Sequence, residues 1–224
     1  MFEEKIELLN KIYGKLPDTL GCTGEGLCCM VQHPHCYYIE FVNMYNYISK
    51  NWSKEEIKNL HLSCVSNYLS NSTNKRCVFL SEEKKCRVYE VRDFNCRSFG
   101  CVPKMAYKKR VRAVKKKHKG VNLCLKSQSG CCKDLRPESY ISESDLDALF
   151  YSIKDLDIDL GFSESEMNEA SNYMTFHDHY LLYYFENNQD LLMKLTHVKM
   201  NYSDDEKAEF LKVMINKMGE SDNE

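Results

Sequence analysis

The cysteines of this chain constrain its fold and chemistry more than any other feature of the sequence. All twelve lie between Cys22 and Cys132, and residues 133–224 contain none. A chain of 224 residues can bury a core large enough to fold without disulfides or metals, so the cysteines are not needed merely to stabilise the fold. In a reducing compartment, clustered thiols bind metals or take part in redox chemistry more often than they form disulfides.

The N-terminal residues, MFEEKIELLNKIYGK, give no sign of export. They are acidic and amphipathic, and they lack the basic start, apolar stretch and cleavage site of a signal peptide. We therefore expect a cytoplasmic location with reduced thiols. The alternative is a mature exported chain with disulfides, whose signal has been removed. No apolar run approaches the ~20 residues that a membrane helix needs, so no membrane partner is expected.

Composition and motifs narrow the function classes. Hydrophobic residues make up 43% of the chain and charged residues 29%, which is typical of a globular protein, and the net charge of −2 favours no class of partner. The sequence contains no Gly-rich phosphate loop, no G-x-S-x-G elbow and no H-E-x-x-H motif. Conventional nucleotide-binding and hydrolase domains are therefore not supported, whereas an unusual enzyme that uses S-adenosylmethionine is not excluded.

The spacing of apolar residues predicts a mostly α fold with a small β-hairpin. Capping boxes at Ser53 and at Ser203 predict that helices begin there. Residues 37–50 are ambiguous between strand and helix. The predicted hairpin covers residues 77–90, and the predicted helices cover residues 2–16, 53–68, 144–156, 163–186, 189–199 and 203–218. We expect a cysteine-rich metal-binding region over residues 1–137, packed on a helical C-terminal part over residues 138–224, either as two parts or as one integrated domain.

Ten cysteines are candidate metal ligands because they fall into three loop groups. Thiolates are soft ligands that suit zinc and iron–sulfur clusters, and such sites commonly need four ligands near tetrahedral geometry. A loop can fold back around an ion, so ligands that lie close in sequence fit this requirement. The groups are Cys22, Cys28 and Cys29; Cys77, Cys86, Cys96 and Cys101; and Cys124, Cys131 and Cys132.

The predicted hairpin limits which of these cysteines can share one ion. In a regular hairpin with a five-residue turn, Leu80 faces Cys86, and Cys77 lies three residues further along its strand. That rise is ~10 Å, which is too far for both thiolates to bind one zinc ion. Either the hairpin is irregular, or the two cysteines serve different sites, or a multi-iron cluster spans the gap. We favour the last two explanations.

The order of these motifs resembles a known family. The segments C-x2-E-G-x-C-C, C-V-F-L and C-R-V-Y-E-V-R-D-x-x-C-R-S-F are similar to the signature of the YkgJ-type cysteine-cluster proteins, described as having a zinc- or iron-chelating domain. The resemblance covers roughly residues 20–101. The positions that match the YkgJ-type signature are Cys22, Cys28, Cys29, Cys77, Phe79, Leu80, Cys86, Tyr89, Arg92, Cys96 and Arg97. The flagellin lysine-N-methylases carry a similar cysteine pattern.

The chain departs from that signature at two positions. Glu25 stands where the family has the second cysteine of the first loop, and Asp93 stands where it has a proline after the arginine. Glu25 is expected either to supply an oxygen ligand or to leave a coordination site open. The alternative is that Glu25 is a solvated residue and another thiol, such as Cys36 or Cys101, fills the gap.

These observations predict a protein that binds an iron–sulfur cluster, or zinc, through clustered cysteines. Twelve thiols suit a multinuclear centre better than a single zinc ion, and Arg92 and Arg97 are expected to offset thiolate charge there. The similarity to the methylases suggests a cluster-dependent enzyme that uses S-adenosylmethionine to methylate a protein substrate. The alternative is a zinc-stabilised module that binds nucleic acid through the basic residues 104–119. We prefer to interpret this stretch as a solvated helix face, because no ladder of aromatic residues interleaves with its charges.

Two further features favour structural interpretations. Cys64 lies on the apolar face of its predicted helix, so a packed thiol is expected there, and a ligand pair with His61 is the alternative. His177 and His179 point about 200° apart on a helix, and His177 falls on an apolar stripe, so it is expected to be a core histidine with its hydrogen bonds satisfied.

Overall fold

The computed structural model describes residues 2–20, 29, 35–70, 76–103, 105, 106, 108, 109, 112, 136–163, 173–186 and 189–220. The fold is mostly α with small antiparallel β elements, as the sequence predicts. In chain order the elements are α1 (Phe2–Tyr13), β1 (Thr19–Leu20), β2 (His35–Cys36), α2 (Tyr38–Asn51), α3 (Lys54–Leu69), η2 (Tyr89–Val91), α4 (Phe94–Arg97), β3 (Arg136–Pro137), α6 (Glu143–Ile158), β4 (Met174–Thr175), α8 (Phe176–Tyr184), α9 (Gln189–Asn201) and α10 (Asp204–Glu220).

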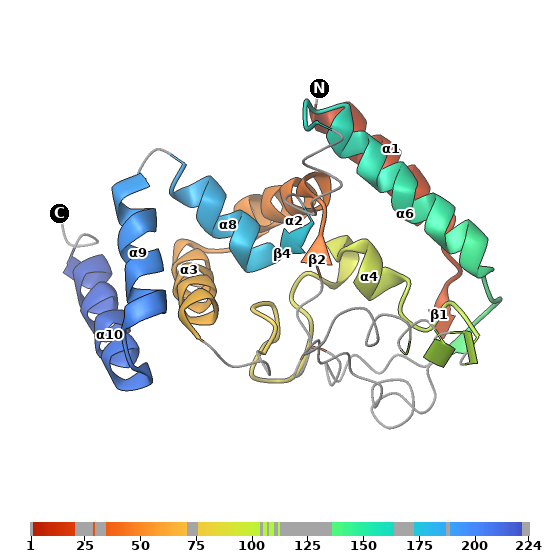
Figure 1. Cartoon of the computed structure of the whole chain (residues 1–224). Coiled ribbons are helices and arrows are strands. Elements are labelled where there is room, and N and C mark those ends of the chain that lie inside the picture. Colours follow the sequence, from red (N-terminus) through yellow and green to blue (C-terminus); the bar gives the residue numbers. More distant parts are fainter. Residues whose placement is uncertain are drawn as a thin grey trace.

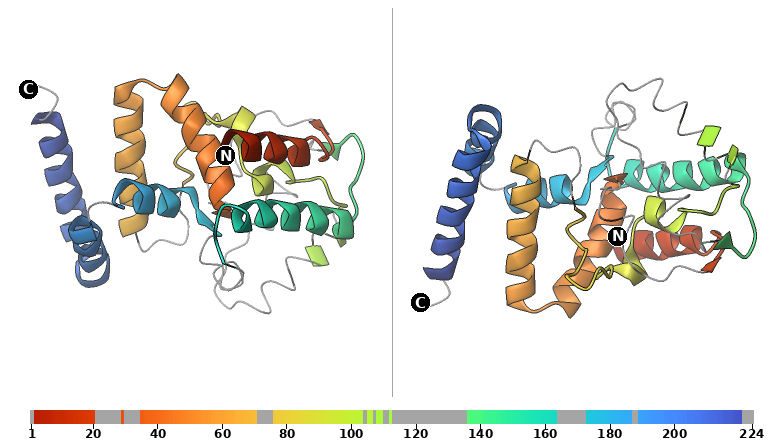
Figure 2. Two further views of the ribbon diagram at one scale, coloured as in Figure 1. Left: turned by 90° about the horizontal axis from the view of Figure 1, so that it is seen from above. Right: turned by 90° about the horizontal axis from the view of Figure 1, so that it is seen from below.

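Helix α2 lies in the middle of the structure (Figure 1). On one side, α1 and α6 run antiparallel to each other and contact α2. On the other side, α8 packs against both α2 and α3, and α9 and α10 lie outside α3 (Figure 2). None of the described helices combines the length and the apolar composition that a membrane span requires.

Two clusters of buried side chains form the core, and α2 contributes to both. The α3–α8 core lies between α2, α3, α8 and α9, and it includes Phe41, Ile48, Leu60, Cys64, Phe176, Tyr180 and Leu195. The α1–α6 core includes Leu9, Tyr13, Tyr37, Ile39, Phe94, Leu149 and Ile153. Each core therefore combines side chains from both sides of residue 137.

Both short sheets join segments that are far apart in the sequence. Strand β1 pairs antiparallel with β3, with Thr19 opposite Pro137. Strand β2 pairs antiparallel with β4, with His35 opposite Thr175. The second pairing places the start of α2 beside the start of α8.

The capping boxes are confirmed at the start of α3 and α10. Ser53 Oγ accepts a hydrogen bond from the N–H of Glu56, whose carboxylate accepts one from the N–H of Ser53. Ser203 and Glu206 exchange the same pair of bonds before α10. The ambiguous residues 37–50 belong to α2. The predicted continuous helix over residues 163–186 is wrong, because β4 precedes α8 and Thr175 caps it; residues 164–172 lie outside the described residues.

Candidate metal centre

Cys29 and Cys77 are joined through their backbones. The N–H of Cys77 donates a hydrogen bond of 2.7 Å to the carbonyl oxygen of Cys29, and the carbonyl of Cys77 accepts one of 3.1 Å from the N–H of Leu80. The second bond closes a turn over residues 77–80. Two segments that are 48 residues apart in numbering therefore meet at these two candidate ligands.

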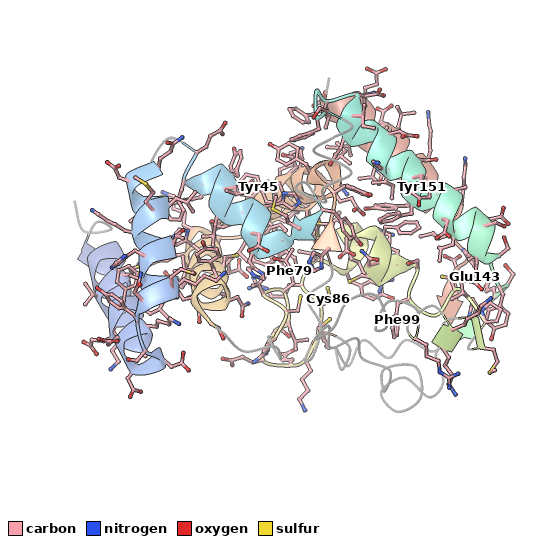
Figure 3. The ribbon with its side chains drawn as sticks, in the orientation of Figure 1. Tyr45, Phe79, Cys86, Phe99, Glu143 and Tyr151 are labelled. Atoms are coloured by element: carbon pink, nitrogen blue, oxygen red, sulfur yellow. The ribbon has the colours of Figure 1, made fainter. Side chains whose placement is uncertain are left out.

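The predicted hairpin is present only as an irregular one. Leu80 and Cys86 form an antiparallel bridge, as expected, and the N–H of Arg87 bonds to the carbonyl of Phe79 at 2.9 Å. The chain does not extend from Cys77 to Leu80, however, because the turn holds the ends of such a segment within about 7 Å of each other. The predicted separation of ~10 Å between Cys77 and the bridge is therefore wrong. It no longer gives a reason to place Cys77 and Cys86 in separate metal sites. Figure 3 shows Phe79 and Cys86 in the segment between α3 and α4.

Cys96 lies in α4, a single helical turn. Asp93 caps this helix and accepts a hydrogen bond of 3.0 Å from the N–H of Cys96. Burial raises the pKa of the Cys96 thiol well above its ordinary value, and the charges of Asp93, Cys29 and Cys77 raise it further. Negative charge on Cys29 or Cys77 would therefore oppose ionisation of Cys96, and this influence connects three candidate ligands from three separate segments.

A buried carboxylate fixes the start of α4. Glu40, which is 1% exposed, accepts hydrogen bonds from the N–H of Phe94 at 2.7 Å, the hydroxyl of Tyr13 at 2.8 Å and the N–H of Tyr37 at 2.9 Å. Burial raises the pKa of Glu40 and the neighbouring Asp93 carboxyl raises it further, whereas these hydrogen bonds lower it. The sequence did not indicate this role for Glu40, because two of its three partners, Tyr13 and Phe94, lie on α1 and α4.

The two arginines expected near the thiolates differ in their partners. Arg97 donates hydrogen bonds to the carbonyls of Arg92 and Glu90, and its guanidinium lies 4.4 Å from the ring centroid of Tyr13. It therefore stabilises the turn before α4. Arg92 lies 3.8 Å from the ring centroid of Tyr89, and its buried Nε has no hydrogen-bond partner among the described residues.

Cys101 is a buried thiol in the segment that follows α4. Its Sγ lies 3.5 Å from the carbonyl oxygen of Arg97 and 3.6 Å from that of Pro17, at the distances of weak S–H···O hydrogen bonds. Burial raises the pKa of Cys101 to about 11, and the charge of Arg92 opposes that shift. Of the two arginines expected near the thiolates, Arg92 therefore lowers the pKa of a candidate ligand, Cys101.

The cysteines of α3 and β2 are packed in the α3–α8 core. Cys64 is fully buried there, which confirms the expected packed thiol, and burial raises the pKa of its thiol. Cys36 is 1% exposed, and its carbonyl oxygen lies 2.9 Å from Nε2 of His179. Cys86 is partly exposed and packs against the same core as Cys77.

The histidines lie in the interior. His177 is 3% exposed and its Nδ1 lies 3.0 Å from the hydroxyl of Thr175, which confirms the expected core histidine. His61 is buried with its ring 4.3 Å from that of Tyr184, and burial lowers its pKa to about 4. Its Nδ1 has no hydrogen-bond partner within the described part of the chain.

Several candidate residues lie outside the described residues: Cys22, Glu25, Cys28, Cys124, Cys131 and Cys132. In the basic stretch 104–119, the described residues 105, 106, 108, 109 and 112 are helical, and Lys108, Lys109 and Arg112 are exposed. Among the side chains that the structure describes, no group of three or more Cys, His, Asp or Glu has an arrangement that would hold a metal ion.

Comparisons with known protein families, with curated proteins and with solved structures found no match.

Proposed function

We propose that this chain binds a soft metal centre through a cysteine group that includes Cys29, Cys77 and Cys96. The observation that carries the proposal is the backbone hydrogen bond of 2.7 Å between Cys77 and Cys29, which brings together two candidate ligands from separate segments, and the charges of both cysteines add to the raised pKa of Cys96. Thiolates are the ligands that zinc and iron–sulfur centres prefer. The same chemistry extends to the candidate ligands Cys22, Cys28, Cys86, Cys101, Cys124, Cys131 and Cys132.

The energetics of burial give a physical reason for a bound cation. Burial and the neighbouring negative charges raise the pKa of Cys96, so without a metal this thiol holds its proton. A bound cation reverses that balance, because a coordinating thiol loses its proton. Metal uptake then releases protons. The competing interpretation is that the three thiols are small hydrophobic groups at the edge of the α3–α8 core, against which Cys29 packs.

The number of cysteines favours an iron–sulfur cluster over a single zinc ion. The turn at residues 77–80 removes the separation between Cys77 and Cys86 as an argument for a multinuclear centre. The proposal for a cluster therefore depends on the count and the grouping of the thiols. Methyl transfer from S-adenosylmethionine to a protein substrate stays a prediction that depends on the similarity to the methylases, and nucleic-acid binding by residues 104–119 stays the alternative.

The test is metal and sulfide analysis after anaerobic purification. The wild-type chain is compared with the combined variant Cys29→Ser, Cys77→Ser, Cys96→Ser, and with Cys64→Ala as a control for the loss of a buried thiol. We expect iron and sulfide with a visible charge-transfer band in the wild type and in Cys64→Ala, and loss of both in the combined variant. A colourless protein with stoichiometric zinc would overturn the cluster, and a protein that takes up neither metal would overturn metal binding.

A further inference from the structure

Glu40 connects the cysteine group to the helical scaffold. It is a carboxylate with almost no exposed surface, and burying such a group is costly unless hydrogen bonds compensate. Its three donors belong to three elements: Tyr13 on α1, Tyr37 immediately before α2, and Phe94 at the start of α4. One side chain thus fixes the position of α4 relative to both helices.

Helix α4 is too short to hold its own position. It has four residues, so most of its N–H groups need partners outside the helix. Glu40 accepts from the N–H of Phe94 at 2.7 Å, and Asp93 accepts from the N–H of Cys96 at 3.0 Å. Cys96 follows Phe94 by two residues, so the contact with Glu40, together with the hydrogen bonds of Asn95 to His35 and Tyr173, fixes where the Cys96 thiol lies.

We infer that Glu40 is a positioning residue that fixes the place of the Cys96 thiol relative to α1 and α2. The consequence for metal coordination rests on the proposed function, but the positioning itself does not. Under the proposed function, Glu40 sets the distance between the Cys96 sulfur and the other ligands without touching the metal. The competing role is purely local, because Glu40 also caps α2 through the N–H of Tyr37.

Asp157 provides a matched control for that competing role. It is a fully buried carboxylate on α6 that accepts hydrogen bonds from the N–H groups of Tyr38 and Ile39 at the same end of α2. Those donors belong to α2 and not to α4. Removing Asp157 therefore weakens the start of α2 and leaves the bond between Glu40 and Phe94 in place.

The first experiment measures alkylation of Cys96 by iodoacetamide in the metal-free full chain, followed by peptide mass spectrometry. The fully buried Cys64 serves as an internal reference, because global unfolding exposes both thiols. We expect Glu40→Ala to raise the rate at Cys96 about tenfold relative to Cys64, and Asp157→Ala to leave that ratio unchanged. Glu40→Gln retains an oxygen that can accept from Phe94, so it should restore most of the protection, and it serves as the test if Glu40→Ala does not fold. An unchanged ratio in the Glu40 variants, or an equal rise in Asp157→Ala, would overturn the inference.

The second experiment follows the thiolate-to-metal absorption band during titration with Cd²⁺. In Glu40→Ala the band should fall by the same amount as in Cys96→Ser, and Asp157→Ala should retain the full band. A full band in Glu40→Ala would show that Cys96 reaches the metal without Glu40, which contradicts the inference. If the wild type takes up no Cd²⁺, metal binding by these thiols fails, while the alkylation ratio still decides whether Glu40 positions Cys96.

Discussion

The carboxylate of Asp157 accepts a hydrogen bond of 2.8 Å from the backbone N–H of Ile39, which lies 118 residues earlier in the chain. Its other oxygen accepts a bond of 2.7 Å from the N–H of Tyr38. The first N–H groups of a helix have no partner within the helix, and a negative charge at that end also interacts favourably with the helix dipole. Helix α6 therefore supplies the cap of α2, the helix that contributes to both cores.

Replacement of Asp157 by alanine should destabilise the protein strongly. The change leaves one buried and one partly buried N–H group of α2 without an acceptor, which we expect to lower the free energy of unfolding by about 2–3 kcal/mol. Urea denaturation at pH 5 measures the effect, because the contribution of Asp157 is larger there than at pH 7 and above. The control is Asp155→Ala, an exposed position on the same helix, which should change the free energy by less than about 0.5 kcal/mol. Similar losses in both variants would contradict the capping role.

The stability of the protein should depend on pH through Asp157. Burial raises the pKa of this carboxyl to about 7 and outweighs its two hydrogen bonds, which lower the pKa. In the unfolded chain the group loses its proton near pH 4, so the folded state binds more protons between about pH 4 and 7. The contribution of Asp157 to stability is therefore complete below pH 4 and decreases as pH rises to 7, by at most about 1.4 kcal/mol per pH unit.

Urea midpoints measured from pH 4 to pH 8 check this dependence. The Asp157→Asn variant cannot ionise at this position, so its stability should decrease less steeply than that of the wild type as pH rises. Parallel curves for the two proteins would show that Asp157 titrates at the same pH in both states.

Arg87 should contribute modestly to the free energy of unfolding. Its guanidinium lies 3.7 Å from the ring centroid of Trp52 and forms an ion pair of 2.7 Å with the partly exposed Glu56. Arg87→Ala should cost about 1 kcal/mol, because cation–π contacts and exposed ion pairs are each weak. Arg87→Lys keeps the charge but loses the planar contact, so it should recover only part of this loss. A full recovery would show that charge alone matters. Since Trp52 is the single tryptophan, thermal unfolding followed by its fluorescence measures both variants.

The same tryptophan should respond to metal binding. Cys86 precedes Arg87, and Trp52 lies against both Arg87 and Phe79, with 6.4 Å between the ring centroids of Trp52 and Phe79. Under the proposed function, titration with Cd²⁺ should change the fluorescence of the wild type, and Cys86→Ser should reduce the change. An undiminished change in Cys86→Ser would place this cysteine outside the ligand set.

Thr175 should act as the cap of α8. Its hydroxyl accepts from the N–H of Asp178 at 3.3 Å and donates to the carboxylate of Asp178 at 2.6 Å. Thr175→Val keeps the shape but removes these bonds, so we expect a loss of about 1–2 kcal/mol in the free energy of unfolding. Ser203→Ala, which removes an exposed cap, should cost less than Thr175→Val in the same denaturation experiment. Equal losses would indicate that burial of the cap has no effect.

The caps show where sequence reasoning works and where it stops. The boxes at Ser53 and Ser203 were predictable, because both partners of a capping box lie within four residues. Thr175 and Asp178 have the spacing of a cap, but apolar residues continue the helical periodicity across Thr175, and the helix over residues 163–186 was therefore predicted as continuous. The pairing of β4 with β2 interrupts the predicted helix, and α8 begins only after Thr175. Strand β2 lies almost 140 residues earlier in the sequence than β4.

The sequence indicated the candidate ligands of the site, but it did not indicate the residues that support them. The spacing of the cysteines indicated Cys29, Cys77 and Cys96, and the bridge between Leu80 and Cys86 followed from the turn. Nothing in the sequence relates Glu40 to Phe94, because a carboxylate on a helix is ordinarily a solvated residue. The turn at residues 77–80 was also missed, since regular strand geometry was assumed up to Cys77.

The distant cap of α2 has a consequence for the order of events during synthesis. Cys29, Cys77 and Cys96 leave the ribosome before Asp157 does, and so does Glu40. Until α6 has emerged, the N–H groups of Tyr38 and Ile39 lack their acceptor, and the α1–α6 core lacks the side chains that α6 contributes. The nascent chain thus carries its thiols for some time without this part of the scaffold, and under the proposed function metal loading is expected only after α6 has been synthesised.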